Sequence, residues 1–166
     1  MSGLITELVN VLVEEADLYK ELVNIAGQKK ELIISNRVDE LKATTSQENT
    51  TAGKIQRLEK KRLSLICDIA NVLNEKEANI TLTALANIIS DQPEAESLNK
   101  VAARLKDSLT DLKELNDQNK VLIENALGYI DFSMNVMRSS LDGAPVVYSA
   151  SGEEISSGHT LFDVKN

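Results

Sequence analysis

The sequence contains few of the residues that form turns, crosslinks or aromatic clusters. Its 166 residues include two prolines, seven glycines, one cysteine, one histidine, three tyrosines, two phenylalanines and no tryptophan. Because β-sandwiches and barrels need frequent turns, the scarcity of proline and glycine argues against them and favours long helices. The scarcity of aromatic residues means that the core must be built mainly from Leu, Ile, Val and Ala.

The missing residue types also exclude several kinds of chemistry. The single histidine, His159, lies near the C-terminus, so the inward-facing Glu-x-x-His pairs of a di-iron helical bundle are absent. Cys67 lies in an apolar helical run beside Ile66 and Ile69, which indicates a core residue rather than a nucleophile. A glycine-rich phosphate loop is absent too. The sequence therefore predicts no catalytic residue, no metal ligand, no cofactor and no small-molecule substrate, and hence no enzyme.

The charge balance excludes further partners. A formal net charge of −8 disfavours nucleic acid, because phosphate binding needs Lys and Arg to displace counterions. The one cationic patch is interpreted as a solvated face beside Glu59, with an anion site as the alternative; its members are Lys54, Arg57, Lys60, Lys61 and Arg62. The N-terminus lacks the pattern of a secretory signal, and no apolar run reaches the roughly 18 residues of a membrane span. A single cysteine fits a reducing compartment, so we expect a cytoplasmic protein.

Apolar periodicity predicts an all-α fold with three long helices and one short helix. The long helices are expected at about residues 4–34, 38–73 and 93–141, and the short one follows the caps at Asn79 to Thr81 and reaches about Ile89. Gly27 is expected to interrupt the first helix, and Ser35 and Asn36 to end it. Short connections predict an elongated antiparallel bundle or coiled coil over residues 1–141. Residues 142–166 are expected to form a flexible tail.

Apolar and polar residues both occupy the predicted inner rows. The first helix should bury Ile5, Leu12, Tyr19, Ala26 and Ile33, joined by Val9, Ala16 and Val23. The second should bury Leu41, Ala52, Ile55, Leu58, Leu65, Ile66, Ile69, Val72 and Leu73. Four polar residues also lie at inner positions: Glu48 and Arg62 in the row of Leu41, Ile55 and Ile69, and Asn116 and Asn119 in the row of Leu112 and Ile123 on the last helix. We interpret them as register-setting or partly solvated positions, with a polar ligand site as the alternative.

The last helix has more apolar surface than one packing face requires. On a wheel with Val121 at zero, Leu98, Val101, Leu105, Leu109 and Leu112 form a stripe at roughly 160–240°, wide enough to pack on the hairpin of the first two helices. Ile123, Ala126, Leu127, Ile130, Met134 and Met137 continue this stripe at roughly 140–240°. A second row, at roughly 0–100°, contains Val121, Leu122, Tyr129, Phe132 and Val136. Either a neighbouring helix covers the second row, or it is exposed for a partner; Val146 to Tyr148 of the tail could also shield it.

Several short motifs follow one another along the predicted helices. In the first two helices they are Leu18-Tyr19-Lys20-Glu21-Leu22, Lys29-Lys30, Val38-Asp39-Glu40-Leu41, Glu48 and Leu58-Glu59-Lys60-Lys61-Arg62. Further on they are Thr81-Leu82, Asn116-x-x-Asn119-x-x-Leu122-Ile123, Leu127-Gly128-Tyr129 and Tyr148-x-x-x-Gly152. With these motifs in this order, the sequence resembles the FlgN family of flagellar type III export chaperones. The resemblance covers about residues 4–141 and rests on order and spacing, since each motif alone is common in helical proteins.

The resemblance implies a cytosolic chaperone without enzymatic activity. Such chaperones hold the C-terminal helical region of hook-associated (hook–filament junction) proteins, prevent premature assembly and present these proteins to the export gate at the membrane. The second row of the last helix would suit this role, because a partner's amphipathic helix needs an apolar groove. The predicted partner-binding residues are Val121, Leu122, Tyr129, Phe132, Val136 and Met137, with Met137 as an adaptable edge and Tyr129 also a candidate contact with the gate.

Other functions fit the same helices. A self-associating structural coiled coil would use the apolar rows to bind copies of itself. A cytosolic regulator that sequesters a transcription or assembly factor would use the same groove as a chaperone. A ligand- or cofactor-binding bundle enzyme is disfavoured by the missing histidines.

Overall fold

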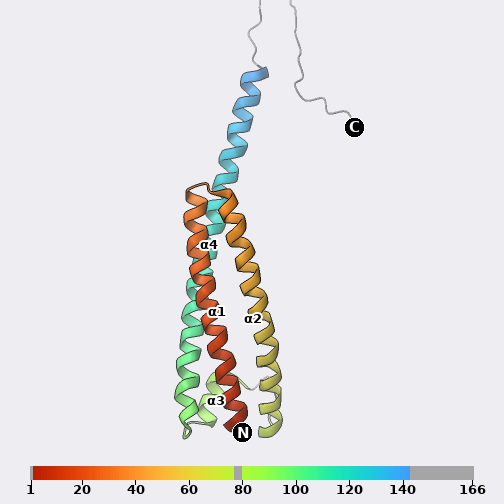
Figure 1. The fold of residues 1–166 in the computed structure, drawn as a ribbon, viewed down its shortest axis with the longest axis vertical. Coiled ribbons are helices and arrows are strands. Elements are labelled where there is room, and N and C mark those ends of the chain that lie inside the picture. Colours follow the sequence, from red (N-terminus) through yellow and green to blue (C-terminus); the bar gives the residue numbers. More distant parts are fainter. Residues whose placement is uncertain (1, 77–79, 143–166) are drawn as a thin grey trace, which may run out of the picture. The chain divides into compact units, whose positions relative to one another are not determined.

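The computed structural model describes residues 2–76 and 80–142, with side chains for residues 3–76 and 80–140. It contains four α-helices, and none of the described residues lies in a strand: α1 (Ser2–Ile34), α2 (Val38–Leu73), α3 (Leu82–Ile88) and α4 (Pro93–Asp142) (Figure 1). The all-α prediction of three long helices and one short helix is therefore confirmed. By contacts the chain divides into two units, Met1–Glu124 and Asn125–Asn166. The boundary between a helical domain 1–141 and a tail 142–166 stays a prediction, since residues 143–166 and their apolar positions lie outside the described residues.

Asparagine residues end the first two helices. At the end of α1, Asn36 has a positive φ of 55°, and the Arg37 N–H donates to the Leu32 carbonyl at 3.0 Å. Asn74 has the same φ at the end of α2, where the Glu75 N–H donates to the Ala70 carbonyl at 3.0 Å. Both arrangements are Schellman motifs, in which asparagine takes the left-handed position that glycine usually occupies. The predicted end of the first helix at Ser35 and Asn36 is confirmed.

The starts of α3 and α4 also follow the sequence signals. The Ala84 N–H donates to Thr81 Oγ1 at 3.0 Å, so Thr81 caps α3 as predicted. Pro93 is the first residue of α4, where its missing N–H costs nothing, and Glu94 and Glu96 lie at the positive end of the helix.

The predicted interruption at Gly27 is wrong, because α1 continues through it to Ile34. One glycine in a helix interior costs only about 1 kcal/mol relative to alanine, and α1 packs along its length. A Cβ atom at position 27 would meet no atom within 4 Å, so no close helix contact requires the glycine.

α1 is the helix on which the other long helices of the first unit pack. It runs antiparallel to α2, as shown by the ion pair of Lys29 with Glu48 near the turn and that of Glu15 with Arg62 further from it. It runs parallel to α4 with an offset of 87 or 88 residues, seen in the Asp17–Arg104 ion pair and the Lys30–Gln118 hydrogen bond. An offset of 88 places Ile34, the last residue of α1, level with Leu122.

The main core cluster draws side chains from all four helices. Its fully buried members include Ile5, Leu8, Leu12, Ile69, Leu85, Ile89 and Leu98. A second, smaller cluster joins Leu22, Ile25 and Ile55 nearer the α1–α2 turn. The predicted aliphatic core is therefore present, with Leu8, Leu22 and Ile25 added to the residues expected from α1.

Some residues expected inside are on the surface, among them Val72 of α2 and Leu109 of α4. Val72 is 54% exposed and Leu109 is 47% exposed. In the last turns of α2 the covered side has moved to Ile69, Ala70 and Leu73, because a 3.6-residue period drifts from a strict seven-residue repeat. On α4 the covered row runs through Leu105, Ser108 and Leu112, and Leu109 lies beside this row.

Three of the four polar residues in the predicted inner rows make contacts between helices. Lys29 Nζ lies 2.7 Å from Glu48 Oε2, and Arg62 Nε lies 3.1 Å from Glu15 Oε1. Asn119 is only 4% exposed, and its Nδ2 donates to the Ala26 carbonyl at 2.9 Å. These contacts join α1 to α2 and to α4, which supports the register-setting interpretation. Asn116 is exposed.

Asn119 has a buried side-chain oxygen, Oδ1, with no hydrogen-bond donor in the described part of the protein. A buried polar atom without a partner costs stability, so we expect Asn119→Leu to raise the free energy of unfolding by about 1–2 kcal/mol. The exposed neighbour provides the control, because Asn116→Leu should change it by less than about 0.5 kcal/mol. Urea denaturation followed by circular dichroism measures both; equal effects of the two substitutions would contradict this account.

Burial raises the pKa of Glu15, although Arg62 beside it acts in the opposite direction. A carboxyl group whose folded-state pKa lies above its unfolded value of 4.5 contributes stability below that value and loses the contribution as the pH rises through the raised pKa. Glu15→Gln removes this titration. The variant should therefore gain stability relative to the original protein between pH 4 and pH 7, as measured by urea denaturation at both values. A relative loss over that interval would show that the Arg62 ion pair outweighs burial.

Candidate partner-binding surface

The described helical part of the second unit exposes large apolar side chains around most of its circumference. Seven of them are between 47% and 72% exposed: Leu127, Tyr129, Ile130, Phe132, Met134, Val136 and Met137. On a wheel at 100° per residue they span an arc of roughly 220°, whereas one packing face needs about 100°. Exposed apolar surface of this extent is typical of binding sites for other proteins. We call residues 125–140 the apolar segment.

The predicted partner-binding residues are divided between the two units. Tyr129, Phe132, Val136 and Met137 belong to the apolar segment and are exposed. Val121 and Leu122 belong to the first unit, where Val121 is 54% exposed and Leu122 is half-buried. The latter two line a shallow depression with Lys30, Asp117 and Gln118. The role of all six in binding stays a prediction.

The packing row of α4 in the first unit has a strict spacing of three and four residues. Its buried or half-buried members are Leu98, Val101, Leu105, Ser108, Leu112, Leu115, Asn119 and Leu122. In the sequence this spacing continues to Ala126, Tyr129, Ser133 and Val136. Helices that pack side by side follow a seven-residue repeat. On a wheel at 100° per residue, the angular position of that repeat shifts by about 20° per seven residues.

The expectation that the packed stripe continues through Ile123, Ala126, Leu127, Ile130, Met134 and Met137 is therefore wrong. Ile123 is already 39% exposed within the first unit, and the other five are exposed in the second. Apart from Ala126, they have their own spacing of four and three residues, which is that of a second coiled-coil seam. Sequence reasoning missed Leu127, Ile130 and Met134 as surface residues because it assigned them to the core.

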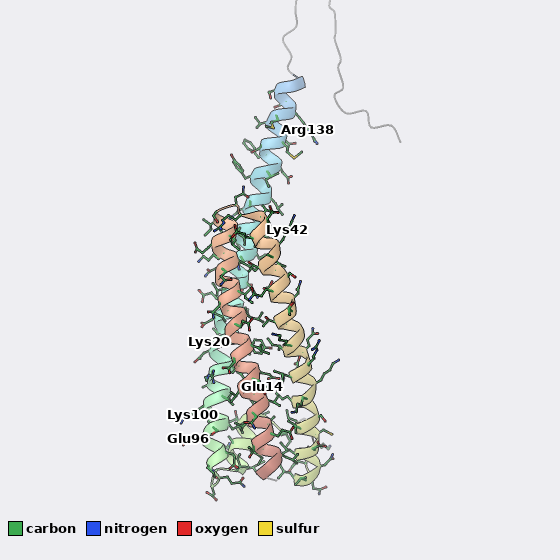
Figure 2. All side chains as sticks on the ribbon, viewed as in Figure 1. Glu14, Lys20, Lys42, Glu96, Lys100 and Arg138 are labelled. Carbon is green, nitrogen blue, oxygen red and sulfur yellow. The ribbon has the colours of Figure 1, made fainter. Side chains whose placement is uncertain are left out.

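Few charges accompany this apolar surface. Among residues 125–140 only Asp131 and Arg138 are charged, and both are exposed (Arg138 is labelled in Figure 2). Gly128 has open space around it, since a Cβ there would meet no atom within 4 Å. A partner of the apolar segment would therefore be recognised mainly by apolar contact, which fits an amphipathic helix.

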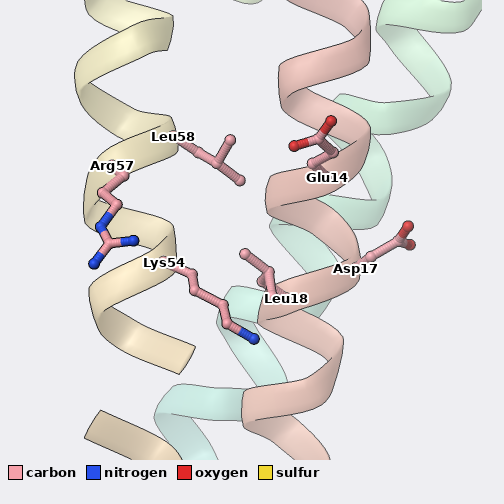
Figure 3. A pocket seen from close by; sticks show the side chains of 6 residues that line it. All are labelled: Glu14, Asp17, Leu18, Lys54, Arg57 and Leu58. Atoms are coloured by element: carbon pink, nitrogen blue, oxygen red, sulfur yellow. The ribbon is translucent and has the colours of Figure 1, made fainter. Parts of the chain in front are cut away.

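Two members of the basic run of α2 form ion pairs with α1. Lys61 Nζ lies 2.9 Å from Glu7, and Arg62 pairs with Glu15 and Glu59. Lys54 and Arg57 line a depression with Leu18 and Leu58, and Glu14 of α1 lies on its other side (Figure 3). Asp17 also lines it, but its carboxylate points away and pairs with Arg104. The alternation of both signs around this depression supports the solvated-face interpretation over an anion site.

Nothing in the described residues suggests catalytic chemistry. No group of three or more His, Cys, Asp or Glu side chains in those ranges is placed to hold a metal ion. Helices long and apolar enough to cross a membrane are likewise absent from the described ranges. The fold and the surface together define the class: an all-helical protein with an exposed apolar helical segment. Such segments are typical of proteins that bind other proteins.

A comparison with family models identifies the particular family. The model described as FlgN protein matches residues 1–155, so the chain belongs to the FlgN family. This is a family of flagellar export chaperones, not of enzymes, and its members bind flagellar hook-associated proteins. No curated protein matches the chain significantly, and no solved structure does.

The exposure of the two methionines in the apolar segment can be tested by oxidation. Met134 is 47% exposed and Met137 is 66% exposed. Mild peroxide treatment should convert both to sulfoxides, as read by peptide mass mapping, because exposed thioethers are accessible to the oxidant. The free energy of unfolding of the first unit should change by less than about 0.5 kcal/mol, since neither side chain belongs to its core. Protection of both methionines in the isolated protein would show that the surface is covered.

Proposed function

We propose that this protein is a cytoplasmic export chaperone that binds the C-terminal helical region of hook-associated proteins. By covering that region it prevents premature assembly of its partner and delivers the partner to the export gate at the membrane. Membership of the FlgN family supports the general role. The observation that carries the binding site is the exposure of seven large apolar side chains on one helical segment.

In this proposal Tyr129, Phe132, Val136 and Met137 contact the partner helix, and Val121 and Leu122 extend the contact. Each half-exposed large side chain gains roughly 1 kcal/mol or more when it is buried. The two aromatic residues contribute the largest contact areas, and the Tyr129 hydroxyl keeps a polar tip that suits a surface shared with the export gate. Met137, unbranched and flexible, can adapt to partners of different shape.

A calorimetric titration tests this proposal. The titrant is the C-terminal segment of the hook-associated proteins from the same genome, and we expect one-to-one binding at micromolar Kd or tighter. Combined Tyr129→Ala and Phe132→Ala substitutions should weaken binding at least tenfold, because about 2 kcal/mol of apolar burial is lost. The matched control is Leu63→Ala, which removes a 55% exposed apolar side chain from α2 and should leave Kd unchanged.

The outcomes separate the assignments. If the double variant stays folded and binds as tightly as the original protein, the contact residues are wrong. If the folded original protein binds no hook-associated segment, the chaperone proposal itself fails.

Self-association remains the second candidate function because of one specific observation. Leu127, Ile130, Met134 and Met137 have coiled-coil spacing, and Asp131 and Arg138 follow Ile130 and Met137 at equivalent flanking positions. Two antiparallel copies would place these opposite charges near each other. Sedimentation equilibrium distinguishes the two functions, since a self-associating protein increases in mass with concentration in the absence of a partner.

A further inference from the structure

The first unit contains an open groove that the proposed function does not use. It has a volume of about 670 Å³ and is lined by residues of all four helices. Leu12, Glu15 and Tyr19 of α1 lie along it, with Arg62 of α2 and Leu82 of α3. The remaining lining comes from α4: Ala102, Leu105, Lys106, Leu109, Thr110 and Lys113. The groove thus lies where α2 and α4 both pack against α1.

The lining of the groove is mainly apolar. Leu12 and Leu105 are buried beneath it, whereas Leu109 is 47% exposed although it lies among apolar neighbours. Tyr19 is half-buried at the groove, and this burial raises the pKa of its hydroxyl. The only buried charge, that of Glu15, is paired with Arg62 at 3.1 Å. An occupant with an apolar face would cover Leu109 at little electrostatic cost.

One edge of the groove is positively charged in a protein whose formal net charge is −8. Lys106 and Lys113, seven residues apart on α4, both line it. Lys100 and Lys120 of α4 pair with Glu96 and Glu124, but Lys106 and Lys113 pair with no residue in the described ranges. The acidic residues of the same stretch, Asp107 and Asp111, line a different depression of α4 that also includes Ala16 and Lys20.

The shape of the groove suits a helix. Beside the groove, α3 already packs as a helix in the main core cluster. Leu85 and Ala86 of α3, and Ile89 directly after it, belong to that cluster together with residues of α1, α2 and α4. Leu82, the first residue of α3, lines the groove. From Ala102 to Lys113 the groove follows α4 for about 17 Å, a length of roughly three helical turns.

We propose that this groove is a docking site for an amphipathic helix of a partner protein, with its apolar face on Leu105, Leu109 and Tyr19 and carboxylates beside Lys106 and Lys113. The docked helix continues the position of α3 and completes a four-helix arrangement in the first unit. Lys106 and Lys113 favour an acidic helix, because carboxylates beside its apolar face would lie against this positive edge of the groove. This site lies wholly in the first unit and does not rest on the hook-associated proteins being the partners of the apolar segment.

The test uses the full-length protein and a fluorescein-labelled helical peptide of three heptads. The peptide has leucine at positions a and d and glutamate at positions e and g, so that like charges oppose its self-pairing. A matched peptide has lysine in place of each glutamate. In about 0.15 M salt, where long-range repulsion from the net charge is screened, anisotropy should show binding of the glutamate peptide at least tenfold tighter than that of the lysine peptide.

Substitutions locate the binding. Combined Lys106→Glu and Lys113→Glu should weaken binding of the glutamate peptide at least tenfold, and so should Leu109→Asp alone. The control is Lys42→Glu with Lys76→Glu, which changes the net charge equally at exposed positions outside the groove and should leave Kd within twofold (Lys42 is labelled in Figure 2). All the substituted side chains are exposed, and circular dichroism confirms that each variant retains its helices.

Several results would overturn the proposal. One is equal binding of the two peptides, and another is no binding of the glutamate peptide to the folded protein. A third is binding that persists in the groove variants but is lost on Tyr129→Ala and Phe132→Ala, because the peptide would then occupy the apolar segment. The last result would leave the proposed chaperone function intact, so the two proposals fail separately.

Discussion

The length of α1 limits how much of α4 the first unit can bury. α1 packs against α2 on one side and α4 on the other, and its register with α4 is fixed by contacts such as Asp17 with Arg104. With an offset of 88, that register ends at Leu122, because the chain turns at Asn36 to begin α2. α4 itself continues to Asp142. Four of the six proposed partner-binding residues, Tyr129, Phe132, Val136 and Met137, lie in this later part of α4.

The first unit is held together by an aliphatic core with a few polar contacts that fix its register. Leu and Ile side chains supply the non-directional part of the stability, and such contacts tolerate sliding between helices. The Glu15–Arg62 ion pair and the Asn119 hydrogen bond to Ala26 are satisfied in one register only. Burial of these groups costs some stability, as polar positions in coiled coils commonly do. The register they fix determines which residues of α4 line the groove.

Two apolar surfaces with different character follow from this arrangement. The apolar segment has large side chains around most of its circumference and only two charges, which favours adaptable, mainly apolar binding. The groove of the first unit has a floor that includes Leu105 and Tyr19, and it carries lysines along one edge. In the two proposals these surfaces take helices of different chemistry.

Sequence by itself determined the helices, their caps and the aliphatic core, because these depend on local spacing and on residue types such as Thr81 and Pro93. It also identified Tyr129, Phe132 and Val136 as surplus apolar residues. Only the tertiary structure decided which row of α4 packs, since a difference between 3.5 and 3.6 residues per turn accumulates over fifty residues. Leu127, Ile130 and Met134 were assigned to the core for that reason. The groove is lined by residues of all four helices, from Leu12 to Lys113, so no local pattern could reveal it.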